Sequence, residues 1–295
     1  LPETTKGFTL EGLGFHGETL ETLYANIKKP LGMILATGPT GSGKTTTLYT
    51  VLSILNVPGV NISTIEDPIE YHMQRINQTQ VRPDIGFSFA TGLRSLVRQD
   101  PDIVMVGEIR DNETASLAIN AALTGHLVLS TLHTNSASGA LPRLLDMRVE
   151  SFLISSTINA IIGQRLVRKL CNGAEKHVLT DSELKKLSSE VDLNRVLDFL
   201  KKEKIVSAKS TWEDIPFYKA KPNTDCPDGY SDRIGIHEVL HITPTIKNLI
   251  IQNATSDQIE EQAKKEGMMS MVEDGIFKCV QGLTTIEEVF RVTTE

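Results

Sequence analysis

The sequence predicts an α/β fold, in which a parallel sheet is covered by helices on both faces in three layers and is followed by a mostly helical C-terminal subdomain. Short apolar runs alternate with stretches of helical periodicity, an order typical of parallel sheets. In the run at 102–108, residues 103–106 are continuously apolar, as expected for a strand covered on both faces. Near Cys171 the pattern changes to lysine-rich helical segments and irregular sequence.

The first half supplies the elements of the sheet. Strands are expected at 31–37, 60–65, 102–108 and 126–133. Helices are expected at 46–55, 89–99 and 112–125. Ser88 is the expected N-cap of the second of these helices, and Gly125 is expected to close the third.

The second half is expected to be mainly helical. Residues 144–170 read as helix throughout, and residues 180–204 read as a charged, lysine-rich helical pair. Residues 208–232 are rich in Pro, Asp and Lys and predict an irregular excursion. The stretch 233–240 is a strand candidate, and the remainder is helical.

The last helix has a start signal in the sequence. Thr284 and Glu287 have the spacing of a capping box, which predicts that the helix begins there.

These elements suggest a division of the chain into three parts. Residues 1–25 are expected to be a lead-in from a missing N-terminal domain, extended in its first residues. Residues 26–170 are expected to form the sheet-containing core. Residues 171–295 are expected to form the C-terminal subdomain, with an irregular insertion at about 205–232 and terminal helices.

Composition limits the classes of partner. The chain has 295 residues, 40% hydrophobic and 23% charged, as in an ordinary soluble globular protein. Its formal net charge of -7 disfavours broad binding to nucleic acid or to an anionic membrane surface. The longest apolar runs are too short to span a bilayer, so no direct membrane insertion is expected. Three widely spaced cysteines argue against a disulfide framework and for reduced thiols: Cys171, Cys226 and Cys279.

The stretch Gly38–Thr45 fits the pattern G-x-x-x-x-G-K-[ST]. Glycines let the backbone curl around phosphate groups, and the helix that follows presents its positive end to the anion. Lys44 is expected to reach the β- and γ-phosphates, and the Thr45 hydroxyl to ligate Mg²⁺. A chance match is disfavoured because the loop follows an expected strand and opens an expected helix, so the loop is predicted to bind nucleotide phosphate groups. The expected nucleotide-binding residues are Gly38, Pro39, Thr40, Gly41, Ser42, Gly43, Lys44, Thr45 and Thr46.

Carboxylates follow two other expected strands. Glu108 comes just after a buried run, at the edge of the sheet where ligands bind in such folds. It is well placed for Mg²⁺, although an exposed loop glutamate is the plain alternative. Glu66, Asp67 and Glu70 follow another strand and suggest a site more than a solvated turn. Spacing alone does not decide which of the three orients water.

Two histidines and three arginines are weaker candidates. His126 and His133 bracket one strand, and each by itself is a structural or surface histidine as readily as a functional one. Arg94 and Arg98 share a helix face and could meet phosphate or a neighbouring carboxylate. Arg110, close after Glu108, is a further phosphate or interface candidate.

Several ordered motifs resemble one family. The chain is similar to the C-terminal ATPase region of the type IV pilus assembly and type II secretion ATPases, the PilB and GspE group. The resemblance covers nearly the whole chain and is carried by "GPTGSGKTTTLY", "TIEDPIEY", "LRSLVRQDPDIVMVGEIRD", "AALTGHLVLSTLHTNSA", "RIGIHEVL" and "GMMSMVEDGIFKCVQGLTTIEEVFRVT".

The resemblance implies a RecA-like P-loop NTPase fold and a role for single positions. Gly38–Thr45 corresponds to the Walker A loop and Glu108 to the Walker B glutamate, which acts through Mg²⁺ and water. Glu70 matches the catalytic glutamate of the family's Asp box. His126 and His133 match its His box, which senses the γ-phosphate and couples subunits.

The resemblance also implies an assembly and a location. The family forms homo-hexamers in the cytoplasm, peripheral to the inner face of the cell membrane, where they dock on an inner-membrane platform protein. ATP and Mg²⁺ are the expected cofactors. The function implied is ATP hydrolysis that drives pilus assembly or protein secretion. A nucleotide-gated scaffold with little turnover remains an alternative, and a hexameric DNA translocase is another that the acidic composition disfavours.

One departure from the family concerns zinc. The family usually carries two C-x-x-C pairs, whereas "LCNGAEKH" and "TDCPDGYSDR" keep one cysteine each, Cys171 and Cys226. A closed zinc site needs four ligands, so His177 and a second group such as His237 would have to complete it. We therefore expect no structural zinc.

Overall fold

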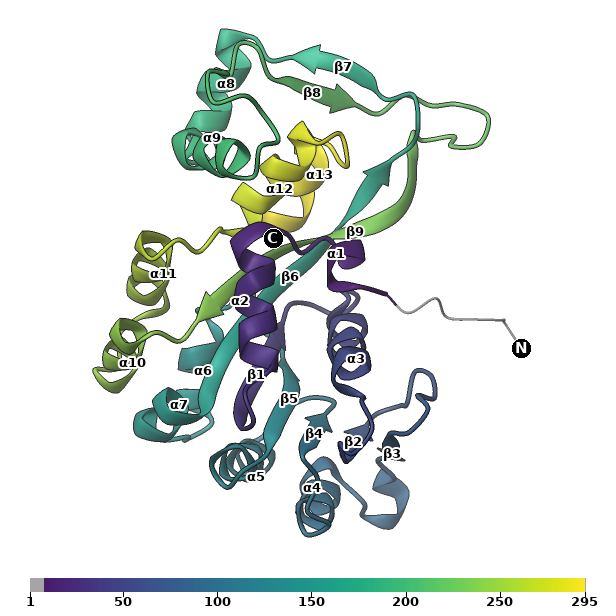
Figure 1. The fold of residues 1–295 in the computed structure, drawn as a ribbon, viewed down its shortest axis with the longest axis vertical. Coiled ribbons are helices and arrows are strands. Elements are labelled where there is room, and N and C mark those ends of the chain that lie inside the picture. Colours follow the sequence, from purple (N-terminus) through teal and green to yellow (C-terminus); the bar gives the residue numbers. More distant parts are fainter. Residues whose placement is uncertain (1–7, 295) are drawn as a thin grey trace.

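The computed structural model describes residues 8–294, and its centre is a seven-stranded sheet in the order β3-β2-β4-β5-β1-β6-β9 (Figure 1). All neighbouring strands are parallel except β6 and β9, which are antiparallel. The fold is thus the predicted α/β class with a largely parallel sheet. The strands are β1 Gly32–Thr37, β2 Ile62–Glu66, β3 Asn77–Gln80, β4 Ile103–Val106, β5 Leu127–Leu132, β6 Ile158–Leu170 and β9 Tyr230–His241.

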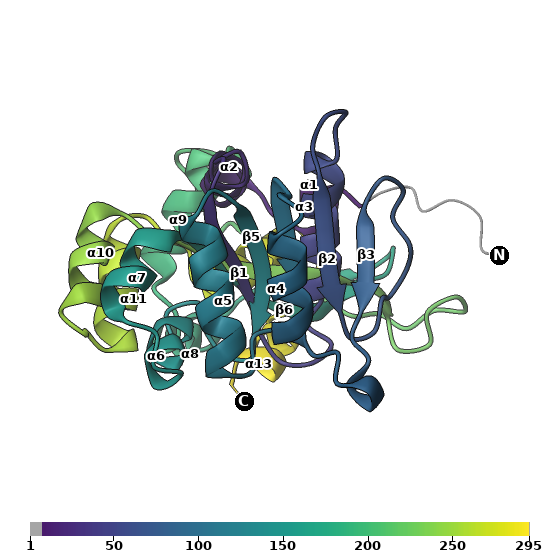
Figure 2. The same cartoon turned by 90° about the horizontal axis from the view of Figure 1, so that it is seen from below.

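Helices cover both faces of this sheet, which confirms the three layers. Along β1, Met33 and Leu35 belong to one buried hydrophobic cluster, whereas Ile34 and Ala36 belong to another. Helices α4 to α7, α10 and α11 supply the first cluster, and α1 to α3 supply the second. Figure 2 shows α10 and α11 at one side of the molecule and β3 at the opposite side. The helices of these layers are α1 Leu10–Leu13, α2 Gly17–Ile27, α3 Lys44–Leu55, α4 Phe89–Val97, α5 Asn112–Leu123, α6 Ala140–Asp146, α7 Ser151–Thr157, α10 Pro244–Ile251 and α11 Ser256–Lys265.

The prediction of helix throughout 144–170 is wrong in its second part. Helices α6 and α7 occupy the beginning, but residues 158–170 form β6, the longest strand. Its start, Ile158 to Ile162, is a continuous apolar run apart from Asn159, and periodicity alone does not separate such a run from a buried helix. The segment is a strand because β1 and β9 pair with its two edges.

Helix starts show how capping decides local boundaries. Ser88 caps α4 with a reciprocal capping box, as predicted. Helix α3 begins at Lys44, two residues before the predicted start. The predicted cap of the last helix is displaced by one residue, because Thr285 accepts the bond from the Glu288 N–H while the Thr284 hydroxyl donates to the Arg168 carbonyl.

A third buried hydrophobic cluster gathers at the outer ends of β6 and β9. It contains the predicted lysine-rich helical pair and two further helices. Beside it, β8 from the excursion pairs with β7 in a two-stranded antiparallel sheet that the sequence did not predict (Figure 1). These elements are β7 Glu175–Val178, α8 Asp181–Ser188, α9 Leu193–Lys202, β8 Pro216–Lys219, α12 Met271–Val280 and α13 Ile286–Thr293. The predicted boundary between residues 170 and 171 stays a prediction. Strand β9 joins the central sheet, and the expectation for residues 1–7 lies outside the described residues.

The cysteines are paired differently from the expectation. Cys171 and Cys226 form a disulfide bond with their Cα atoms 6.6 Å apart, so the prediction of reduced thiols is wrong for this pair. The chain brings them together because Cys171 directly follows β6 and its N–H donates to the Gly229 carbonyl, three residues beyond Cys226. Cys279 is a buried free thiol in α12, as predicted. Among residues 8–294 no three His, Cys, Asp or Glu side chains cluster as metal ligands would, and the absence of zinc stays a prediction.

Charged side chains are buried where the loop before α2 meets α12. The His16 imidazole contacts Asp274 at 2.7 Å and Glu203 at 2.9 Å. The Lys278 ammonium donates to Asp274 at 2.6 Å and to the Gly235 carbonyl at 2.8 Å. Two cations and two anions therefore balance one another in a network that we call the buried charge cluster (His16, Glu203, Asp274 and Lys278).

Within the described part of the chain, no helix is both long and apolar enough to cross a membrane.

Candidate nucleotide-binding site

The glycine-rich loop follows β1 directly and leads into α3, as the sequence predicts. Gly38 has a φ of +143°, and a Cβ there would lie 2.6 Å from the Gln164 carbonyl oxygen, so only glycine fits without a shift. Gly41 and Gly43 also have positive φ. The Lys44 ammonium folds back on the loop, donating to the Gly38 carbonyl at 2.8 Å and the Pro39 carbonyl at 3.0 Å. The loop is thus held in a curled shape by its own lysine.

Gln164 on β6, which the sequence analysis did not single out, supports the glycine-rich loop. The Gln164 side chain on β6 donates to the Ser42 carbonyl at 2.7 Å. Both groups are buried, and the Ser42 hydroxyl has no hydrogen-bond partner among the described residues. Gln164 escaped prediction because its segment was expected to be helical.

The loop lies along a cavity of about 630 Å³ at the carboxyl ends of the parallel strands. This is the edge where ligands bind in open parallel sheets. The loop, the acidic turn after β2 and the segment after β4 all contribute to it. The lining residues are Thr40, Gly41, Gly43, Lys44, Thr45, Thr46, Leu48, Glu66, Asp67, Pro68, Glu70, Tyr71, Phe89, Met105, Gly107, Glu108, Arg110, Thr131, His133 and Leu166.

Glu108 lines this cavity and contacts two neighbouring side chains. One carboxylate oxygen lies 2.5 Å from the Arg110 guanidinium, and the other lies 3.4 Å from His133 Nε2. Strand β5 holds the backbone just before Glu108. The Ser130 hydroxyl donates to the Val106 carbonyl, and the Thr131 hydroxyl donates to the Gly107 carbonyl. The structure thus brings Glu108, Arg110 and His133 together.

The acidic turn separates its glutamates by burial. Glu66 is buried and accepts hydrogen bonds from Tyr49, Thr64 and Gln78, so its carboxylate is engaged in the core. Burial and the Glu66 carboxylate raise the pKa of the Tyr49 hydroxyl. Glu70 is exposed and lines the cavity. Of these two glutamates, Glu70 is therefore the one placed to meet a ligand.

Of the loop residues predicted to bind nucleotide, Gly38, Pro39 and Ser42 do not line this cavity. Three of the other candidates also do not reach it. His126 precedes β5, at the opposite edge of the sheet, where its Nδ1 lies 3.0 Å from the Ala121 carbonyl oxygen. Arg94 forms an exposed ion pair with Glu113 at 2.7 Å. Arg98 is an exposed residue at the end of α4. Since β5 runs between His126 and His133, the two histidines lie about 20 Å apart along it.

The charges of the cavity suit an anionic ligand with a divalent cation. Burial lowers the pKa of the Lys44 ammonium, the nearby Glu108 carboxylate raises it, and the Arg165 guanidinium lowers it further. The backbone N–H groups at the start of α3 add a partial positive charge beside the loop. The Thr45 hydroxyl and the Glu108 carboxylate are hard oxygen donors of the kind that Mg²⁺ takes.

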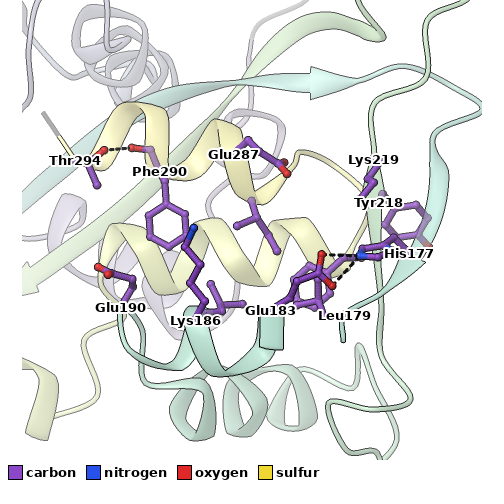
Figure 3. A pocket seen from close by; sticks show the side chains of 13 residues that line it. His177, Leu179, Glu183, Lys186, Glu190, Tyr218, Lys219, Glu287, Phe290 and Thr294 are labelled. Atoms are coloured by element: carbon purple, nitrogen blue, oxygen red, sulfur yellow. Dashed lines mark hydrogen bonds and ion pairs between the residues drawn. The ribbon is translucent and has the colours of Figure 1, made fainter. Parts of the chain in front are cut away.

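A second cavity, of about 480 Å³, is lined by residues later in the chain, from α8, the two-stranded β7–β8 sheet and α13 (Figure 3). Its apolar wall includes Leu179 and Phe290, and His177 pairs with Glu183 beside it. None of the residues predicted for nucleotide chemistry lines it, so it is separate from the candidate site.

Comparison with known proteins places the chain among secretion proteins. The family model described as "Type II/IV secretion system protein" matches residues 1–291. The chain is 47% identical to a type II secretion system protein E of Xanthomonas campestris, over 100% of this chain and 49% of that protein. It is 45% identical to the type IV pilus assembly ATPase PilB of Pseudomonas aeruginosa, over 97% of this chain and 48% of that protein. The chain thus spans about half the length of these relatives.

Solved structures agree with this placement. The crystal structure of the pilus retraction motor PilT with bound ADP is 29% identical and superposes with a TM-score of 0.69, over 100% of this chain and 69% of that one. The ATPase DotB of Legionella pneumophila is 22% identical with a TM-score of 0.64, over 97% of this chain and 65% of that one, which shows the same fold. From its match to the family model and its identity to these relatives, the chain belongs to the type II/IV secretion system protein family.

Proposed function

We propose that this chain binds ATP with Mg²⁺ in the cavity at the carboxyl edge of the sheet and hydrolyses it. The observation that carries the proposal is that the glycine-rich loop, Glu108 and Glu70 line one cavity, although they follow three different strands. A phosphate-binding loop alone serves binding only. Hydrolysis also needs a group for the metal and a group for the water.

Each side chain has a place in this proposal. The loop N–H groups and Lys44 hold the β- and γ-phosphates, and the Thr45 hydroxyl holds Mg²⁺. When bound, Mg²⁺ neutralises charge that develops on the phosphates. Glu108 orients water on the metal, and Glu70 orients the attacking water. His133, which lies 3.4 Å from Glu108, senses the γ-phosphate.

In the longer protein, we propose that this hydrolysis drives type IV pilus assembly or type II secretion. Of the relatives named above, one is a type II secretion system protein E and another is a type IV pilus assembly ATPase. The chain matches these two almost equally well. The proposed assembly is a homo-hexamer in the cytoplasm that docks on an inner-membrane platform protein, with no nucleic acid partner. Arg94 and Arg98, which face away from this chain's own cavity, are available to a neighbouring copy.

Phosphate release from ATP in the presence of Mg²⁺ tests the proposal, with matched variants in the same assay. Lys44→Ala is expected to weaken ATP binding and turnover together. Glu108→Gln and Glu70→Gln are expected to keep ATP bound and to lower kcat by about a hundredfold or more. Unchanged rates with and without DNA are expected for a protein motor.

Glu66→Gln is the control within the acidic turn, because Glu66 is engaged with Tyr49 and Thr64. If Glu66→Gln abolishes turnover while Glu70→Gln keeps it, the assignment of the water-orienting residue is wrong. ATP binding without phosphate release would favour the scaffold function. Phosphate release that requires DNA would favour a translocase.

A further inference from the structure

The loop after His133 is held from outside by the two longest strands. Residues 134–139 connect His133 to α6. Arg165 on β6 donates to the Asn135 carbonyl at 3.1 Å. Glu238 on β9 accepts a hydrogen bond from the Ala137 N–H at 2.6 Å. These two side chains come about 30 and 100 residues later in the chain. The position of this loop therefore depends on the strand pairing that places β6 and β9 beside it.

The Glu238 side chain reaches the loop by passing over a glycine. Glu238 is directly opposite Gly163 in the β6–β9 pair. A Cβ on Gly163 would lie 2.6 Å from the Glu238 Oε1 atom, the same atom that accepts from Ala137. A larger residue at 163 would therefore displace the carboxylate from the loop.

The same carboxylate also contacts the start of α12. Burial raises the pKa of Glu238 to about 7, and hydrogen bonds from the backbones of Ala137 and Met271 oppose this shift. Glu260 raises the pKa further, and Lys264 lowers it. Since Glu238 is only 4% exposed, its carboxylate is committed to the two backbone groups. It thus connects the loop after His133 to α12.

We propose that Glu238 is a positioning residue for the nucleotide site: by holding the Ala137 N–H, it fixes the loop that follows His133 and so the distance of His133 from Glu108. Glu238 itself does not line the nucleotide cavity, so it acts through His133. This inference rests on the proposed function, because it assigns Glu238 a part in ATP hydrolysis.

A matched control is present in the same part of the chain. Glu273 on α12 is also a glutamate and is also 4% exposed. Its carboxylate accepts from the Ser270 N–H and from Arg195, and these contacts belong to the C-terminal helices. A purely structural role predicts similar consequences for Glu238 and Glu273, whereas positioning predicts that they differ.

The first experiment separates kcat from KM in the wild type, Glu238→Ala, Glu238→Gln and Glu273→Ala. A misplaced group costs about tenfold to a hundredfold in rate, so Glu238→Ala is expected to lower kcat by this factor and to leave the KM for ATP within about twofold. Glu238→Gln keeps an oxygen that accepts from Ala137, so it is expected to restore kcat to within about threefold of wild type. Glu273→Ala is expected to keep the wild-type kcat.

The second experiment does not depend on hydrolysis. Amide hydrogen exchange of residues 134–139 is expected to be faster in Glu238→Ala than in the wild type, and unchanged in Glu238→Gln and Glu273→Ala. A wild-type chain that releases no phosphate would end the proposed function, and the exchange rates would still show whether Glu238 holds the loop.

Two results would overturn the inference. One is a wild-type kcat and an unchanged exchange rate of the loop in Glu238→Ala. The other is an equal loss of kcat in Glu238→Ala and Glu273→Ala, which would mean that any buried glutamate of this region serves the fold in general.

Discussion

Two clusters of acidic and basic side chains lie at different depths in this molecule. In the candidate nucleotide cavity, Glu108 contacts His133 and Arg110, whose side chains are 48% and 66% exposed. At the centre of the buried charge cluster, Asp274 and Lys278 are 4% and 1% exposed, and His16 and Glu203 at its rim are 20% and 21% exposed. Arg110 and His133 are open to a ligand, whereas Asp274 and Lys278 can meet only protein groups.

Burial decides what each cluster can do. Burial lowers the pKa of Lys278, and the Asp274 carboxylate raises it. Burial would raise the pKa of Asp274, but Lys278 and His16 outweigh it and hold that pKa well below its usual range. The charges of this network are paired with one another, so none is left to bind a ligand. The network joins the loop before α2 to α12. The comparison therefore predicts effects on stability for the buried cluster and on chemistry for the cavity.

The largest effect is expected from Asp274→Asn. The change removes the anion between His16 and Lys278 and leaves a buried ammonium without its counter-charge. Breaking a buried pair in this way costs about 3–5 kcal/mol of unfolding free energy. Urea unfolding followed by circular dichroism measures the loss. A loss below about 1 kcal/mol would show that water reaches the cluster, and the contrast between the two regions would no longer hold.

An intermediate effect is expected from pH, through His16. Burial lowers the pKa of His16, but hydrogen bonds to Asp274 and Glu203 outweigh it and raise that pKa to about 9. An unfolded histidine has a pKa of about 6.5. The stabilisation from protonated His16 is therefore complete below about pH 6.5 and is lost as the pH rises to about 9.

The measurement is the unfolding free energy of the wild type minus that of His16→Gln, at several pH values from 6 to 9.5. By linkage, the difference is expected to shrink by about 3 kcal/mol over this range, with part of that change shared with Asp274. A difference that is constant with pH would mean that His16 is not protonated in the folded protein.

The smallest effect on stability is expected from Glu108→Gln. Its partners His133 and Arg110 are largely exposed, and exposed ion pairs contribute about 0–1 kcal/mol. The unfolding free energy should therefore change by less than about 1 kcal/mol, although turnover is expected to be lost. A stability loss as large as that of Asp274→Asn would place Glu108 with the structural charges instead.

The sequence was most informative where a motif is local. The glycine-rich loop, Glu108 and the acidic turn each follow a strand within a few residues, so chain direction alone placed them at one edge of the sheet. The same reasoning could not choose between Glu66 and Glu70. That choice depends on Tyr49 and Gln78, which come from other elements and bury Glu66.

What the sequence did not predict depends on long-range pairing. Gln164 and Glu238 act on loops far away in the chain, and only the pairing of β6 with β1 and β9 brings them there. The disulfide between Cys171 and Cys226 depends on the same pairing, because β9 begins four residues after Cys226. Misreading residues 158–170 as helix thus concealed all three features.

The length of β6 has a mechanical consequence. Near its middle it contacts the glycine-rich loop through Gln164, and beyond its far end lie the two-stranded β7–β8 sheet and the outer helices (Figure 1). Its 13 residues, at about 3.3 Å each, make a rod of about 40 Å, which β9 stiffens along ten paired positions. A tilt of about 5° at its β1 end would move the other end of such a rod by about 3.5 Å. A small change in the angle of β6 beside the candidate site would therefore become a displacement at the outer surface.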